Sequence, residues 1–428
     1  MRGVYVLLLI SLFGYAGRVG GQESVTITQC YEWARANYPQ IHQMGLIDQT
    51  ERYSLSNVGK AWLPQLSVSG KASYQSDVTK LPFDGDKISS LLPGFEIPSL
   101  SKDQYQVVAQ VDQTIWDGGS TRSARALTRA EAIANREQLE SELYALNDRV
   151  NQIYFGCLLQ DELIRQNALL QKELQVNIER IEAMMENGVA NQSDLESMEV
   201  ELLNARQNEI ELKASRTVYR QMLATFINKP LTDQVVLKTP ESPERSLSTQ
   251  INRPELRALD AKSEWIETQN KQVTAGLMPR IGAFVQGGYG RPGLNMLEDS
   301  FEPYYVAGVR LSWNLGKLYT LKNDRRKIEV SRRQIDVQRE TFLFNTRLQL
   351  LRQNTEIKKM TDLMRADDDI IRLRTSIKQA AEVKLENGVI SVTDLIREIN
   401  AEDMARQTAA AHRVQRLMTI YNYMYTTN

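Results

Sequence analysis

The sequence predicts a mixed α and β membrane protein, built as a tandem repeat with four transmembrane strands per chain and long helices. Three observations predict this fold. The chain begins with an export signal, two long segments contain no proline, and a set of motifs recurs at constant offsets.

Composition excludes several classes of function. The 428 residues carry 52 basic and 53 acidic side chains, and this near-balance argues against a nucleic-acid binder. Two cysteines and two histidines are too few for a disulfide scaffold or a multi-histidine metal centre, so we expect no metal site and no cofactor. The mean hydropathy of −0.41 argues against a helical membrane protein but not against a membrane β-barrel, whose strands alternate in polarity.

Residues 1–21 have the three parts of an export signal. A basic start at Arg2 precedes an apolar stretch at 4–13, and small residues follow it. The apolar stretch is too short for a spanning helix. A buried first strand or helix is the alternative interpretation. A lipid anchor on Cys30 is disfavoured, because residues 26–29 are not the small apolar run that such processing requires.

The two proline-free segments predict long helices at 120–186 and 317–386. The first is rich in Ala, Leu, Glu, Arg and Gln, and glycine is rare in both. Each would extend for roughly 100 Å, a length that favours coiled-coil-like packing. Within the first segment, we expect Tyr154 and Phe155 to pack between helices and Cys157 to be a buried free thiol.

The second half of the chain repeats the first. The turn motif at 187–195, Asn-Gly-Val followed by Asp-Leu, recurs at 387–395, an offset of 200 residues. Earlier pairs such as Pro64 and Pro279 keep an offset of 215, because the loop at 79–102 is longer in the first copy. Each copy is predicted to contain a helix, two strands and a long helical hairpin. The expected segments are a signal peptide at 1–21, a first repeat at 22–228, a linker region at 229–250 and a second repeat at 251–428.

The predicted strands alternate between apolar and polar residues. They lie at 65–74 and 105–115, and at 281–289 and 305–313 in the second copy. A period of two with one polar face indicates half-buried strands. Strands of about ten residues with aromatic residues near their ends also fit a lipid-facing barrel with a wet interior. A soluble antiparallel sheet packed on helices is the alternative that periodicity does not exclude.

The polar phase of these strands contains the candidate lumen residues Lys71, Gln110, Asp112 and Arg310. The alternative is that they lie on an ordinary solvated sheet. Four strands cannot close a barrel, and lipid does not tolerate open sheet edges, so at least two chains must contribute strands. Three chains would supply twelve.

The sequence resembles the TolC-like family of outer-membrane efflux and secretion channels. The resemblance rests on the duplication, on Trp-Leu-Pro-Gln-Leu at 62–66, on Ile-Trp-Asp-Gly-Gly at 115–119 and on the Asn-Gly-Val turns. It implies a homotrimer with a 12-stranded β-barrel, continued by a long periplasmic α-helical barrel that tapers to a closed tip. The linker at 229–250 would form a small equatorial region, and the family has no catalytic residues.

The resemblance also implies a function and partners. The chain would be a passive exit duct of a tripartite efflux pump or type I secretion system, placed in the outer membrane and extending into the periplasm. Its expected partners are a periplasmic adaptor (membrane fusion) protein, an inner-membrane RND, ABC or MFS transporter reached through that adaptor, and outer-membrane lipid. No nucleic acid is expected.

The resemblance implies that the two helix turns dock onto the adaptor. These turns contain Asn187, Gly188, Val189, Asn387, Gly388 and Val389. The family often has Val-Gly-Leu there, so the changed flanks leave the choice of adaptor open. A glycine that simply ends a helix is the alternative, and both interpretations can hold together.

The pore-constriction candidates are Asp194, Asp394 and Glu398. Both aspartates also fit the third position after a helix N-cap, where a carboxylate favours the helix, and this structural interpretation explains them without a pore. The resemblance implies that three copies of Asp394 would form a cation-selecting ring. The family's second acidic step is occupied by Arg397, with Glu398 next to it, which weakens that expectation.

The family's gating contacts, which join aspartate, arginine and tyrosine side chains near the tip, are expected to be absent here. Leu385 and Ile390 stand at the corresponding positions, so a closed state must be held by other contacts. Two further hypotheses remain open. A periplasmic coiled-coil adaptor would need one hairpin between lipoyl-like and small barrel halves. A secreted hydrolase would need a nucleophile, base or metal set, and the sequence shows no such motif.

Overall fold

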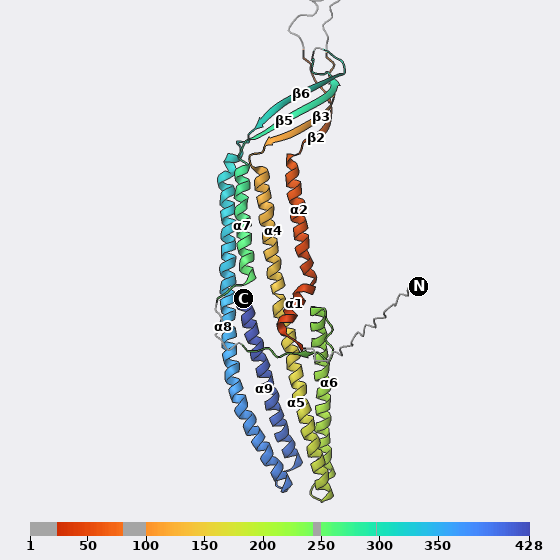
Figure 1. Ribbon diagram of the computed structural model, residues 1–428, viewed down its shortest axis with the longest axis vertical. Coiled ribbons are helices and arrows are strands. Elements are labelled where there is room, and N and C mark those ends of the chain that lie inside the picture. Colours follow the sequence, from red (N-terminus) through yellow and green to blue (C-terminus); the bar gives the residue numbers. More distant parts are fainter. Residues whose placement is uncertain (1–23, 80–99, 243–249, 297) are drawn as a thin grey trace, which may run out of the picture. The chain divides into compact units, whose positions relative to one another are not determined.

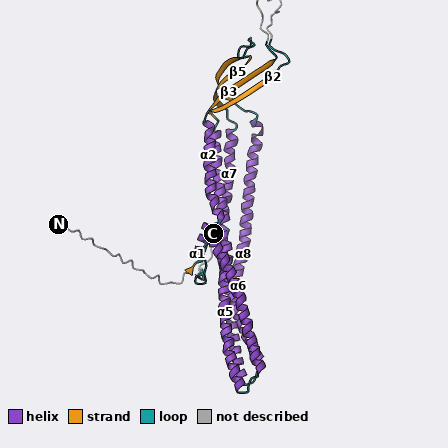
Figure 2. Ribbon diagram, turned by 90° about the vertical axis from the view of Figure 1, so that its right-hand side faces the viewer, coloured by secondary structure: helices purple, strands orange, loops and turns teal. Residues whose placement is uncertain are grey.

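The computed structural model describes residues 24–79, 100–242, 250–296 and 298–428 (Figure 1). The predicted signal peptide at 1–21 lies outside these residues, as does most of the loop at 79–102. The described chain is mostly helical, with one four-stranded sheet and one two-stranded pair (Figure 2).

The elements follow the predicted order twice. The first half contains β1 (Ser24–Val25), α1 (Ile27–Asn37), a 3-10 helix (Pro39–His42), α2 (Gln43–Gly59), a second 3-10 helix (Lys60–Trp62), β2 (Gln65–Tyr74), β3 (Asp103–Trp116), α4 (Ser120–Tyr144), α5 (Leu146–Glu186) and α6 (Gln192–Ile227). The second half contains β4 (Val236–Leu237), α7 (Pro254–Ala275), β5 (Arg280–Arg291), β6 (Glu302–Ser312), α8 (Lys317–Glu386) and α9 (Val392–Thr427). Among the described helices, none is both long and apolar enough to cross a membrane.

The long helix predicted at 120–186 is divided at Ala145, whereas that at 317–386 is continuous. Ala145 keeps right-handed helical angles, so the interruption is one residue long. Beside it, the ring of Tyr144 stacks on Tyr425 at 4.9 Å, and the Tyr144 hydroxyl donates to the Tyr425 carbonyl at 2.8 Å. Trp313, which the sequence places in the last strand, lies just after the end of β6.

The chain forms two compact units, each assembled from both sequence repeats. The sheet unit contains His42–Ser141 and Pro254–Leu343. The hairpin unit contains the chain up to Ile41, described from residue 24, with Glu142–Arg253 and Phe344–Asn428. The predicted repeats therefore give the order of elements along the chain, whereas each compact unit joins matching parts of the two.

In the sheet unit, four antiparallel strands stand in the order β2-β3-β5-β6. The strands are joined at one end to α2, α4, α7 and the start of α8 (Figure 1). The central pair, β3 and β5, brings the two repeats together, with Gln110 opposite Gln286. The outer edges of β2 and β6 pair with no other strand among the described residues.

The hairpin unit has a core where α1, α5, α6 and α9 meet the β1-β4 pair. Tyr154 and Phe155 are buried there, as is the free thiol of Cys157. The Tyr154 hydroxyl lies 2.9 Å from the carbonyl of Val25 on β1, which pairs with β4. The linker is held by buried Arg220, whose guanidinium donates to two carbonyls of residues 232–235 at 2.6 Å.

A second core lies nearer the helix turns of the same unit. It contains side chains from α5, α6, α8 and α9, including Ile181, Met198, Leu385, Leu395 and Ile399. The ends of the α5-α6 and α8-α9 hairpins therefore pack on each other through apolar side chains, which is the packing that the long proline-free segments predict.

Candidate functional site

The sheet has one apolar face, and this face is the exposed one. The cross-strand register pairs Val68 with Ala109 and Val285 with Ala307, and both pairs lie on this face. The large side chains of this face are 38–81 % exposed, namely Leu66, Val68, Tyr74, Tyr105, Val107, Val111, Val285, Tyr289, Tyr305, Val309 and Leu311. A sheet in water buries such a face, so this arrangement needs an apolar environment or a partner.

The opposite face carries the polar residues, and in β3 these are the half-buried ones. Gln110 donates to Asp112 at 2.7 Å, and the Arg310 guanidinium lies 4.8 Å from the ring centre of Phe284. A cavity of about 310 Å³ is lined by Asp112, Phe284 and Arg310 together with neighbouring residues of β3, β5 and β6. The structure thus brings all four candidate lumen residues onto one face, where Lys71 lies opposite Gln106.

Aromatic residues flank the exposed apolar face at both ends. Tyr74, Tyr105 and Tyr289 lie toward the end away from the helices, and Trp116 and Trp313 lie toward the helices. Exposed tyrosine and tryptophan at two levels, separated by an apolar band, are typical of strands that cross a membrane.

The two helix turns have the same backbone geometry. Gly188 and Gly388 have φ of +73° and +66°, which an L-residue with a side chain rarely adopts. The amide of Val189 donates to Met184 at 2.9 Å, and Val389 donates to Lys384 at the same distance. All six predicted turn residues are exposed, and these two valines are 57 % and 68 % exposed.

Both candidate aspartates take the capping role. Asp194 and Asp394 accept the backbone N–H of Asn191 and Ser391 at 3.1 Å, and each donates its own N–H back to that residue's side chain. Hydrogen bonds from Ser391, and more weakly the charge of Arg397 at 3.6 Å, lower the pKa of Asp394. A pore role for these carboxylates is compatible with the cap, because the side chain of Asp394 is 42 % exposed.

Glu398 is already paired with two guanidinium groups. It lies 3.4 Å from Arg374 on α8 and 3.3 Å from Arg397 on its own helix. Leu385 is buried in the core between the hairpins, and Ile390 packs against that core. These two positions therefore hold the hairpins by apolar contact.

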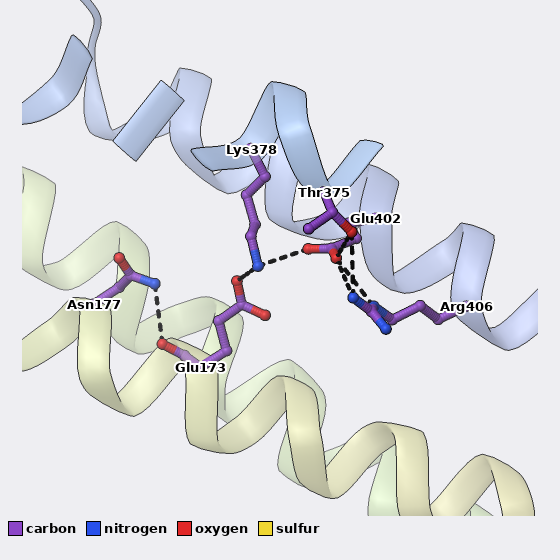
Figure 3. Close-up of polar contacts among 6 residues, drawn as sticks. All are labelled: Glu173, Asn177, Thr375, Lys378, Glu402 and Arg406. Atoms are coloured by element: carbon purple, nitrogen blue, oxygen red, sulfur yellow. Dashed lines mark hydrogen bonds and ion pairs between the residues drawn. The ribbon is translucent and has the colours of Figure 1, made fainter. Parts of the chain in front are cut away.

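A buried ionic cluster joins the two hairpins, and sequence reasoning missed it (Figure 3). Lys378 of α8 lies 2.6 Å from Glu402 of α9 and also bonds to Glu173 of α5. Glu402 further accepts hydrogen bonds from Thr375 and Arg406. The Glu402 side chain is only 3 % exposed, and these neighbours replace the water that an exposed carboxylate would bind.

The protonation states of this cluster follow from burial and pairing. Burial alone would raise the pKa of Glu402, but hydrogen bonds from Lys378, Thr375 and Arg406 outweigh it and lower that pKa. For Lys378 burial opposes the charge, and the bonds to Glu173 and Glu402 raise its pKa. Asp403 lies next to the cluster, and burial together with the charges of Glu173 and Glu402 raises its pKa to about 6.

The comparisons with known proteins agree with this geometry. Residues 30–229 match the model of the outer membrane efflux protein family. Over these residues the chain is similar to that family. No curated protein matches the chain. The predicted resemblance to TolC-like channels and the predicted outer-membrane location with a periplasmic extension are confirmed. The family match supports the broad prediction of an outer-membrane efflux duct, and the family consists of transport proteins.

Solved structures share the fold at low sequence identity. CusC, described as forming a transmembrane channel, is 14 % identical over 94 % of this chain and 92 % of its own, with a TM-score of 0.65. The outer-membrane channel OprN is 14 % identical over 94 % and 89 %, with a TM-score of 0.66. The outer membrane protein VceC from Vibrio cholerae is 12 % identical over 93 % and 95 %, with a TM-score of 0.62.

Proposed function

We propose that this outer membrane efflux protein is a homotrimeric exit duct. It receives substrate from a periplasmic adaptor and an inner-membrane transporter, and conducts it passively to the outside. The two systems that use such a duct are a tripartite efflux pump and a type I secretion system. No step in this proposal requires catalysis by this chain.

The observation that carries the proposal is the exposed apolar face of the four-stranded sheet. Its apolar face is exposed and bordered by aromatic residues, whereas Gln110 and Asp112 lie on the half-buried polar face. In lipid, backbone groups at the free edges of β2 and β6 must be paired. Three chains, joined edge to edge, would give a closed barrel of twelve strands with Lys71 and Arg310 facing a wet lumen.

The helix turns are the proposed adaptor contacts. Val189 and Val389 are exposed apolar side chains at the tips of the two hairpins, and each follows a glycine that fixes the turn. Two similar tips per chain give six related docking positions in a trimer. An exposed apolar residue at a rigid turn is suited to a partner helix that covers it on binding.

The proposed pore constriction uses Asp394, with Asp194 and Glu398 as weaker candidates. The Asp394 carboxylate has a lowered pKa and stays ionised, so three copies would attract cations. Arg397, 3.6 Å away, offsets part of that charge. We therefore expect a weakly cation-selective aperture.

The Glu173–Lys378–Glu402 cluster is the proposed contact that keeps the hairpins together in the closed state. Lys378 reaches Glu173 across the gap between α8 and α5, whereas its bond to Glu402 stays between α8 and α9. Opening would break the first bond and keep the second. Such a switch lets α8 and α9 move as one hairpin.

Negative-stain imaging of detergent-solubilised protein tests the proposal. A trimer would appear as a tapered tube of about 130–150 Å with three-fold end views, since a helix of roughly 100 Å adds to a membrane barrel of about 30 Å. A monomeric particle that stays dispersed without detergent would overturn it, because the apolar face would then not need lipid.

A further inference from the structure

A cavity of about 1070 Å³ lies between α4 and α7 in the sheet unit. Its wall includes Arg122, Arg125 and Arg129 from the first turns of α4, and Lys271 from the last turns of α7. All four side chains are exposed. The cavity is thus open and carries four cationic groups at the end of the helices that adjoins the sheet.

These four cations have no ionic or hydrogen-bonding partner in the described part of the chain. Arginines of the same helices that lie farther from the sheet do have an ionic partner. Arg136 lies 2.8 Å from Asp48, and Arg257 lies 3.2 Å from Glu137. A cluster of unpaired guanidinium groups repels itself and is stabilised by an anion that accepts several hydrogen bonds.

The carboxylate in the cavity wall does not supply that anion. Asp117 accepts the backbone N–H of Gly119 at 2.9 Å and of Thr121 at 2.6 Å, so it serves the first turn of α4. The start of α8 adds further positive charge to the same unit. Its first eleven residues contain one acid, Asp324, and five bases, namely Lys317, Lys322, Arg325, Arg326 and Lys327.

The cavity is continuous with the exposed apolar face of the sheet. Trp116 lines the cavity and stands opposite Ile281 in the sheet register, on the apolar side. Trp62 and Met278 also line the cavity, and these three side chains are 39–41 % exposed. Gly118, with φ of +66°, allows this turn to approach α7, because a Cβ there would lie 2.5 Å from Met278. A ligand in this place meets cations on one side and an apolar surface on the other.

We propose that the cavity binds the phosphate headgroup of an acidic glycerophospholipid. The arginines and Lys271 would contact the phosphate, and the acyl chains would lie along the apolar face beyond Trp116. This inference rests on the proposed function, since it requires the apolar face to be in a bilayer. A free phosphate ion would satisfy the cations, but it would leave the tryptophans and Met278 without a role.

The test uses the full mature chain in vesicles of phosphatidylcholine that contain a minor fraction of phosphatidylglycerol. Insertion is measured first by vesicle flotation. The protein is then extracted in mild detergent, and the phosphatidylglycerol and phosphatidylcholine retained per chain are counted by mass spectrometry. The test variant is Arg122→Gln/Arg125→Gln/Arg129→Gln. The control, Lys359→Gln/Arg365→Gln/Arg372→Gln, removes the same charge from exposed positions in the hairpin unit.

We expect the natural protein to retain phosphatidylglycerol in preference to phosphatidylcholine. One basic residue near an acidic lipid is worth about fivefold in binding, so Arg122→Gln should lose about that factor and the triple variant of the order of a hundredfold. The control variant should retain as much as the natural protein. If the triple variant does not insert, the single variant and the charge-preserving Arg122→Lys decide the question.

Three results would overturn the inference. The first is equal retention of phosphatidylglycerol by natural and triple-variant proteins that both insert. The second is displacement of the lipid by inorganic phosphate at matched concentration, which would make this a free-ion site. The third is a natural protein that fails to insert at all, which would overturn the proposed function as well. Flotation separates this last failure from the first two.

Discussion

The ammonium group of Lys378 lies 2.6 Å from the carboxylate of Glu402, and together they connect two helices of one hairpin to a third helix of the other. The pair is the inner part of a charged cluster whose members come from positions 173 to 406 of the chain. Removing one partner from such a pair leaves a buried charge unbalanced, and this makes the cluster open to a direct test.

Replacing Glu402 by glutamine should destabilise the hairpin unit. The amide cannot balance the charges of Lys378 and Arg406, and we expect a loss of about 3 kcal/mol, as for other broken buried pairs. Urea unfolding followed by circular dichroism measures it. The control is Glu329→Gln, whose side chain is 60 % exposed and pairs with Arg333; its cost should stay below about 0.5 kcal/mol. Equal effects of both substitutions would contradict the buried-pair account.

Asp403 should make stability depend on pH in the opposite sense to Glu402, whose pKa is lowered. Its folded pKa of about 6 lies above the ordinary value of 3.8, so the folded state holds the proton more tightly. Its contribution therefore falls as pH rises from 3.8 to 6, and the full penalty applies above that window. Asp403→Asn should stabilise the protein at pH 8 by about 1 kcal/mol, discounted for partial exposure. If Asp403→Asn changes the free energy of unfolding by the same amount at pH 4 and at pH 8, the raised pKa is contradicted.

The two faces of β5 should respond differently to the same charge. Val285 lies on the exposed apolar face, and Gln286 is its neighbour on the polar face. Lysine at a lipid-facing midpoint costs about 2–4 kcal/mol, so Val285→Lys should reduce insertion into vesicles strongly. Gln286→Lys should insert as the natural protein does. Equal insertion of the two variants, or poorer insertion of Gln286→Lys, would contradict the placement of lipid on the Val285 face.

The turn at 386–391 should separate backbone strain from adaptor contact. Gly388→Ala must place a side chain at φ of +66°, which costs about 1 kcal/mol and should lower the melting temperature. Val389→Asp changes only an exposed side chain and should leave that temperature unchanged while weakening capture of the adaptor. Full adaptor capture by Val389→Asp would remove this turn from the interface.

Tethering the tips should block export if they must separate. Asp394→Cys, oxidised between neighbouring chains, should abolish export and recover it on reduction. The natural thiols of Cys30 and Cys157 do not interfere, because burial raises the pKa of each to about 12. Arg365→Cys, an exposed position away from the tip, is the control. Normal export with complete cross-links at 394 would show that this aperture need not open.

Local signals explain what could be predicted. Strand alternation, the Asn-Gly-Val turns and the capping aspartates each lie within about ten residues, and the structure contains all of them at the expected positions. The interruption at Ala145 could not be predicted in this way. It lies where Tyr144 stacks on Tyr425, a residue that is almost three hundred positions farther along the chain.

By itself, the sequence determined the order of the elements, the duplication and the two faces of each strand, because these depend on neighbouring residues and their periodicity. Only the tertiary structure decided which charges pair and which stay unpaired. Glu173 and Lys378 meet because two hairpins pack, and Arg122 and Lys271 share a cavity because α4 and α7 lie side by side. In the sequence, each of these is one of many charged residues on a helix. Nothing local distinguishes a buried ion pair or a cation in a cavity wall from a solvated side chain.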